Sequence, residues 1–188
     1  MKTKLSLTLI GILVATGLST AFVAQTSVAG PLPGQSTTLG HSPTLVRVVR
    51  ASTQRFLHIS QASAEGYGPL LGCTSGDEGG SMGLHYANPG LVGDGALDAT
   101  RPEVLMYEPK ADGRMQLLGV DYVVIAEAWD AGHAAPPVLM GQLFHYEESP
   151  NRYGLPAFYA LHVWAWKPNP KGVFADWNPT VTCQYYAG

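Results

Sequence analysis

Two strand-like runs separated by a turn constrain the fold most. Residues 104–108 and 115–127 have the composition of β-strands, and the residues between them, Pro109 to Gly113, include turn-forming Pro, Asp and Gly. This pattern predicts an antiparallel hairpin. Similar runs predict further strands, at residues 82–87, 138–146, 157–166 and 181–185. Around the first of these, eight glycines among residues 72–95 predict a structured loop region.

A single helix of about 20 residues is predicted ahead of the strands, over residues 43–66. Ser42 is a suitable N-cap, Pro43 suits the first turn and Gly66 is typical of a helix end. Apolar residues recur at helical spacing and form one stripe, which consists of Leu45, Val48, Val49, Phe56 and Ile59. The chain is therefore predicted to be α+β, with one N-terminal helix packed on an antiparallel β-sheet or a partly closed β-barrel. A β-sandwich is the alternative.

The N-terminal residues have the features of an export signal. Lys2 and Lys4 precede a mostly apolar stretch, and residues 27–29 fit the small-x-small pattern of a cleavage site. We expect three parts: a signal peptide at 1–29, a flexible leader at 30–42 and a single globular domain at 43–188. The mature protein is then secreted or periplasmic, without a stable membrane anchor after cleavage. A retained anchor is the alternative, because the apolar stretch is about long enough to span a bilayer.

Charge and missing motifs exclude several classes of function. The 188-residue chain has a formal net charge of −3, whereas a nucleic-acid-binding domain presents a basic face. The sequence contains no G-x-S-x-G, H-E-x-x-H, P-loop or G-x-G-x-x-G motif. Residues 94–98 are too short and too poor in oxygen ligands for a calcium loop. We therefore predict no nucleic-acid partner and no common hydrolase or nucleotide site.

Cys73 and Cys183 are the two cysteines of the chain. In an exported protein, an oxidising compartment favours a disulfide between them. The alternative is a pair of thiolate metal ligands, but the C-x-x-C spacing of such sites is missing. The predicted disulfide joins the end of the chain to the beginning of its core.

Two histidines and two acids stand in predicted strands among apolar residues. His162 shares a face with Phe158, Ala160, Trp164 and Trp166, and His85 follows the small residues of the segment 80–84. Asp121 shares a face with apolar residues, where an unpaired carboxylate is costly, and Glu108 ends the preceding strand. These four residues, His85, His162, Asp121 and Glu108, are the candidate metal ligands.

Imidazole and carboxylate together suit Zn²⁺, Cu²⁺ or Fe²⁺, with one position left for water. If the site is catalytic, the metal would activate water or dioxygen. Two other interpretations remain open at this stage: a buried polar network that orders the core, and acid–base catalysis without a metal. Three other histidines are predicted to be solvated or to pack near the surface: His41, His58 and His133.

Three tryptophans suggest a function of another class. Trp164 and Trp166 share a strand face, and Trp177 follows in a loop with Asp176 and Asn178. If exposed, these rings would form an aromatic binding face for a carbohydrate or a partner surface. If they point inward, they belong to the core, which is the usual place of large aromatic residues. The alternative to a metal-dependent enzyme is therefore a non-catalytic module that binds a carbohydrate or a partner surface. A small molecule or a glycan is the expected class of ligand for the chain.

Several motifs are similar to those of a group of uncharacterised small exported bacterial proteins. They are SMGLHY at 81–86, LMYEP at 105–109, GVDYV at 119–123, LHVWAWKPNP at 161–170 and ADWNP at 175–179, together with Cys183. The resemblance covers about residues 45–185 and implies export, without an activity or a cofactor. The spacing of His85 and His162 also resembles the two half-motifs of cupin barrels, although the H-x-H pair of the first half-motif is missing.

Overall fold

The computed structural model describes residues 43–76 and 79–188. The predicted signal peptide at 1–29, the leader at 30–42 and His41 lie outside the described residues. The described part is α+β and mostly β, as predicted from the sequence. Its helical segments are short: α1 (Thr44–Thr53), the 3-10 helix η1 (Gln54–Leu57), α2 (Ile59–Ala64), α3 (Pro89–Val92) and α4 (Ala126–Asp130). None of the helices in the described ranges is both long and apolar enough to cross a membrane.

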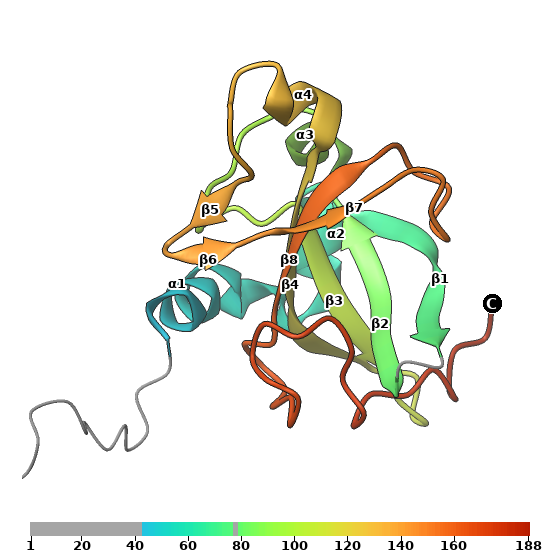
Figure 1. Cartoon of the computed structure of the whole chain (residues 1–188). Helices are drawn as coiled ribbons and strands as arrows, with labels where there is room; N and C mark the ends of the chain where they lie inside the picture. The colour runs from blue at the N-terminus through green and yellow to red at the C-terminus, as the bar shows by residue number, and fades with distance from the viewer. Residues whose placement is uncertain (1–42, 77–78) are drawn as a thin grey trace, which may run out of the picture. The chain divides into compact units, whose positions relative to one another are not determined.

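Six strands form an antiparallel sheet in the order β1-β2-β3-β4-β8-β7, which curves into an open half-barrel (Figure 1). The strands are β1 (Gly68–Gly76), β2 (Gly80–Ala87), β3 (Val104–Pro109), β4 (Met115–Ile125), β7 (His145–Glu147) and β8 (Phe158–Val163). The predicted hairpin of β3 and β4 is confirmed, with Pro109 opposite Met115 at its turn. Two short strands, β5 (Val138–Leu139) and β6 (Gln142–Leu143), form a separate hairpin.

The two faces of the sheet have different roles. On one face, buried side chains of β2, β3, β4 and β8 pack against α1 and η1 in the main hydrophobic core, which includes Val49, Phe56, Tyr107, Tyr122 and Val163. Side chains alternate between the two faces along each strand. The opposite face therefore carries a second set, which includes Val104, Val123, Phe158 and Ala160. This second face forms the floor of the candidate site.

The N-terminal helical segment differs from the prediction of one helix. The segment is divided into α1, η1 and α2, because Thr53 leaves the α conformation (φ −108°, ψ 3°) and His58 is extended (φ −103°, ψ 109°). The Thr53 hydroxyl donates a hydrogen bond back to the Val49 carbonyl, which is four residues earlier. Hydroxyl groups that compete for backbone carbonyls in this way favour the bending of a helix. The apolar stripe is nevertheless buried as expected, at Leu45, Val49 and Phe56.

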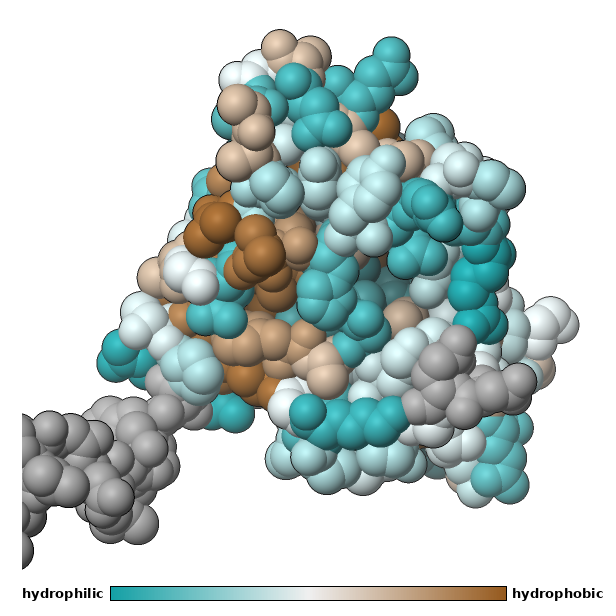
Figure 2. Space-filling model, in the orientation of Figure 1, coloured by the Kyte–Doolittle hydropathy of each residue, from teal (hydrophilic) through white to brown (hydrophobic). Residues whose placement is uncertain are grey.

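Two predicted strands are wrong in detail, and one strand was missed. Residues 138–146 are interrupted by Met140 and Gly141, both with positive φ, so that β5 and β6 turn back on each other. Apolar side chains gather over this hairpin in Figure 2, and Val138, Met140 and Leu143 are among the exposed ones. Residues 181–185 form no strand. The predicted loop at 72–76 is instead part of β1, an irregular edge strand with breaks in its register against β2.

The predicted disulfide between Cys73 and Cys183 is confirmed, with the two Cα atoms 5.7 Å apart. It joins β1 to the C-terminal segment across a separation of 110 residues. The same segment is also held by Glu108, whose Oε1 accepts a hydrogen bond from the backbone N–H of Thr182. The C-terminal residues, which follow β8 without forming a strand, are thereby fixed against the sheet.

Candidate metal centre

Strand pairing brings Asp121 and His162 together. They are partners in the register of β4 and β8, so their side chains leave the same face of the sheet at the same level. His85 lies on β2, with β3 between it and β4. One ligand atom from each of the three residues lies within 4.8 Å of the other two. We call these three residues, His85, Asp121 and His162, the metal triad.

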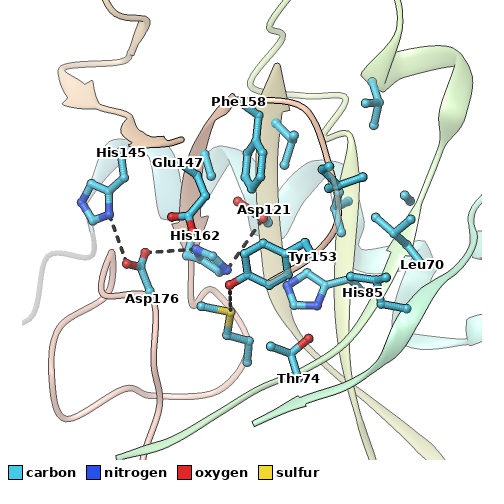
Figure 3. A pocket seen from close by; sticks show the side chains of 18 of the residues that line it. Leu70, Thr74, His85, Asp121, His145, Glu147, Tyr153, Phe158, His162 and Asp176 are labelled. Atoms are coloured by element: carbon cyan, nitrogen blue, oxygen red, sulfur yellow. Dashed lines mark hydrogen bonds and ion pairs between the residues drawn. The ribbon is translucent and has the colours of Figure 1, made fainter. Parts of the chain in front are cut away.

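The metal triad lies in a pocket of about 450 Å³. Apolar side chains of β3, β4 and β8 and of the loop after β7 form most of its wall. Thr74, Tyr153 and Phe158 surround the triad in Figure 3. Figure 2 shows this face of the molecule hollowed to the right of its centre, with polar side chains around the edge. The triad is thus a polar group within an apolar cavity that opens to the surface.

His162 lies between two carboxylates (Figure 3). Its Nε2 is 3.7 Å from Asp121 Oδ2, and its Nδ1 is 3.2 Å from Asp176 Oδ1. Burial lowers the pKa of His162, but the negative charges of Asp121 and Asp176 outweigh burial and raise this pKa above its ordinary value. Asp176 also lies 3.2 Å from Nδ1 of the exposed His145. Asp176 therefore connects the buried triad to a side chain at the surface.

The other two members of the triad, His85 and Asp121, also have shifted pKa values. Burial and the neighbouring His162 lower the pKa of His85 to about 3, against a hydrogen bond to the Gly83 carbonyl. His85 is therefore a neutral imidazole at physiological pH, which is the form that binds a metal. Burial raises the pKa of Asp121 to about 6, and His162 partly offsets this effect. Above that pH, Asp121 is an anion in an apolar cavity.

Three buried polar atoms of the triad have no hydrogen-bond partner within the described residues. They are Oδ1 of Asp121 and both ring nitrogens of His162. Asp176 is close to Nδ1 of His162, but the pair lacks good hydrogen-bond geometry. Buried polar groups in folded proteins nearly always have a partner, so these atoms are available to water or to a ligand from the cavity.

Glu108, the fourth predicted ligand, is not part of the triad. Its Oε2 forms ion pairs with Lys110 and with Lys167, the latter at 2.8 Å. The prediction failed because Glu108 lies near the turn of the hairpin, opposite Gln116, whereas Asp121 is opposite Val104 at the other end of β3. The two carboxylates are therefore at opposite ends of the hairpin. Glu108 holds the C-terminal segment instead.

The three tryptophans do not form one exposed binding face. Trp164 is 2% exposed, and its Nε1 donates a hydrogen bond to the Ala175 carbonyl. Trp166 packs against the main core and donates to the hydroxyl of Thr53. β8 ends at Val163, so the predicted strand alternation does not extend to these residues. Trp177 lines the pocket, where the guanidinium of Arg152 lies over its ring.

Asp176, Tyr153 and His145 are neighbours of the triad that the sequence pattern did not single out as site residues. Tyr153 and Asp176 lie outside the predicted strands, and His145 lies at the end of the predicted strand 138–146 and begins the edge strand β7. The folded C-terminal segment brings Asp176 to His162. The only sequence signal was the position of Asp176 beside Trp177. His58 and His133 are exposed, in agreement with their prediction as surface residues.

Fold and site together define an α+β protein with a curved antiparallel sheet and a His/Asp/His group in an apolar pocket. Comparison with protein-family models, with curated proteins and with solved structures found no match. The resemblances to exported bacterial proteins and to cupins therefore stay predictions.

Proposed function

We propose that this chain is an exported protein that binds one divalent transition metal ion, Zn²⁺, Cu²⁺ or Fe²⁺, through His85, Asp121 and His162. The observation that carries this proposal is the meeting of two imidazoles and one carboxylate, with ligand atoms within 4.8 Å of one another, in an apolar pocket. Two histidines and one carboxylate are a common ligand set of catalytic zinc and of non-haem iron sites, which keep positions open for water or substrate.

The distances fit one ion after a small contraction. Metal–ligand bonds of about 2.0–2.1 Å in tetrahedral geometry place ligand atoms about 3.3 Å apart. The atoms of the triad are at most 4.8 Å apart, so binding requires side-chain movements of about 1 Å, without a change in the sheet.

A purely structural polar network explains the triad less well. In such a network, the buried polar atoms satisfy each other. Here Asp121 Oδ1 and both nitrogens of His162 lack partners, and Nε2 of His162 is 3.7 Å from Asp121 Oδ2, too far for a hydrogen bond. A metal ion between these atoms would satisfy Nε2 and one oxygen of Asp121 at the same time.

Asp176 has the position of a carboxylate that orients a metal ligand. Histidines that bind metals usually donate their second N–H to a carboxylate or a carbonyl, which fixes the ring and raises its basicity. Asp176 Oδ1 is near Nδ1 of His162, so that Nε2 is left for the metal. Bound in the pocket, the metal would act as a Lewis acid on water or on a ligand, which makes a metal-dependent enzyme the expected class of activity.

Export is the second part of the proposal. It is supported by the signal-like pattern at 1–29 and by the disulfide between Cys73 and Cys183, since disulfides persist mainly in oxidising compartments. Expression of the full chain in a bacterium, followed by N-terminal sequencing of the periplasmic product, tests this part. We expect cleavage after Ala29, and a full-length product retained in the cytoplasm would contradict it.

The metal site is tested with protein that carries no His-tag. The protein is stripped of metal, dialysed against Zn²⁺ or Co²⁺ and analysed for metal content. We expect one ion per chain in the wild type, and loss of this ion in His162→Ala. His58→Ala, which removes an exposed histidine, is the matched control and should keep the full content. A wild-type content far below one ion per chain, or equal contents in both variants, would overturn the proposal.

A further inference from the structure

The apolar wall of the pocket extends away from the triad along β4 and β8. After the pair Asp121–His162, the next pairs on the same face are Val123–Ala160 and Ile125–Phe158. Each step covers two residues, so this wall is about 13 Å long at about 3.3 Å per residue. All six residues line the pocket. The cavity therefore has Asp121 and His162 at one end of an elongated apolar floor, and His145 and Glu147 of β7 line it beside this floor.

The polar end of the pocket favours a group that both donates and accepts hydrogen bonds. Asp121 Oδ1 is a buried acceptor without a partner, and Nε2 of His162 beside it is also unpartnered. In the metal-free protein, a hydroxyl group can donate to Asp121 and accept from Nε2–H of His162, and a single oxygen atom does both. A carbonyl or an ether oxygen only accepts, and would leave the buried carboxylate oxygen unpaired.

The charges around the pocket disfavour an anionic ligand. Asp121, Glu147 and Asp176 all line it. Arg152 also lines it, but its guanidinium already donates to the Ser75 carbonyl and lies over the ring of Trp177. A carboxylate or phosphate group at the polar end would meet Asp121 at close range in an apolar cavity, where like charges repel strongly.

We propose that the pocket binds an uncharged, elongated hydrocarbon molecule with one terminal hydroxyl group, an aliphatic alcohol, whose oxygen lies between Asp121 and His162. This inference rests on the same residues as the proposed function and deepens it, because it names the class of ligand that the same pocket would take. The contacts that select the alcohol are also present when no metal is bound. The ligand class can therefore be tested separately from the metal.

The test compares three small probes with metal-free protein in the presence of a chelator. Hexan-1-ol, its isomer 1-methoxypentane and hexanoate have similar hydrocarbon parts, but the ether cannot donate a hydrogen bond and hexanoate is an anion. Binding is followed by the NMR shifts of the methyl groups of Val123 and Ile125. We expect hexan-1-ol to bind at least tenfold more tightly than either of the other probes. Equal affinities of alcohol and ether, tighter binding of hexanoate, or no binding of hexan-1-ol would each overturn the proposal.

A variant checks that the probe occupies this wall. Ala160 lies in the middle of it, so Ala160→Leu should fill the cavity and weaken hexan-1-ol binding at least tenfold, with an unchanged circular dichroism spectrum. Ala51→Leu on the exposed side of α1 is the control and should bind as the wild type does. Should Ala160→Leu fail to fold, the wild-type methyl shifts still decide the question. Metal binding without alcohol binding contradicts this inference alone, and alcohol binding without metal binding contradicts the proposed function alone.

Discussion

Asp121 and His162 stand opposite each other on neighbouring antiparallel strands, with Nε2 of the imidazole 3.7 Å from Oδ2 of the carboxylate. This pair is fixed by the register of β4 and β8, in the most buried part of the sheet. A one-residue slip of either strand would turn one of the two side chains to the opposite face. The sheet therefore assembles the candidate site, and the placement of these two candidate ligands does not depend on a loop.

Asp176→Asn is expected to weaken metal binding about 10- to 100-fold without removing it, the usual effect of losing a carboxylate that orients a histidine ligand. The asparagine keeps the size of the side chain but not the charge near Nδ1 of His162. Competition with a zinc chelator of known affinity measures the change. Asp112→Asn is the control, since Asp112 lies in the exposed β3–β4 turn and pairs with Arg114. Equal affinities of both variants would assign no orienting role to Asp176.

The central strands β2, β3, β4 and β8 and three of the candidate ligands were predictable because their signals are local. The hairpin of β3 and β4 has turn residues between two apolar runs, and a carboxylate or imidazole within such a run is costly unless it is partnered. His85, Asp121 and His162 all meet this criterion. Glu108 was selected as well, although the predicted turn at Pro109 to Gly113 already places Glu108 beside the turn and Asp121 well beyond it. The observed register places Glu108 opposite Gln116, away from the triad.

The features that the sequence did not predict depend on contacts between residues far apart in the chain. Asp176 reaches His162 only because the C-terminal segment folds back over the sheet, where Trp164 N–H bonds to the Val173 carbonyl and the disulfide holds Cys183. Trp164 and Trp166 lie after the end of β8, where the alternation of strand faces no longer applies. Neither feature leaves a periodic pattern in the sequence. The break of the N-terminal helix at Thr53 was also not predicted. The Thr53 hydroxyl bonds to the Val49 carbonyl, and the spacing of the apolar residues does not indicate this bond.

Gly119→Ala is expected to destabilise the fold by about 3 kcal/mol, at the upper end of the cost of overpacking a core. A Cβ atom on Gly119 would lie 2.1 Å from the Val163 carbonyl oxygen, on the strand that carries His162. The two strands would have to move apart. Gly68→Ala is the control, because a Cβ atom at Gly68 meets nothing within 4 Å. Urea unfolding of both variants measures the difference, and similar midpoints for the two would show that the close approach at Gly119 is not needed.

Replacement of both cysteines, as Cys73→Ser with Cys183→Ser, is expected to lower the free energy of unfolding by about 2–5 kcal/mol. The bridge closes a long loop, with a sequence separation of 110, so its loss gives the unfolded chain much more freedom. Urea unfolding of the oxidised wild type and of the double variant gives the difference. The wild type under reducing conditions should unfold like the double variant. An unchanged midpoint after reduction would contradict the expected role of the bridge.

Glu103 is expected to make the fold less stable as the pH rises from about 5 to about 8. The side chain is buried, and this burial raises its pKa from 4.5 to about 8, although one oxygen accepts a hydrogen bond from the Val123 N–H. In this range the folded protein keeps the proton and the unfolded chain has lost it. The folded state therefore binds more protons, and stability falls with pH by up to about 1.4 kcal/mol for each unit.

Glu103→Gln isolates this effect from the other titrating groups. The amide stays neutral and can accept the same hydrogen bond from Val123, so the variant should lose the part of the pH dependence that belongs to Glu103. Urea unfolding of wild type and variant at pH 5, 6, 7 and 8 gives two profiles, and their difference should change by a few kcal/mol across the series. Parallel profiles would mean that the carboxyl group of Glu103 titrates in the folded protein as it does in the unfolded chain.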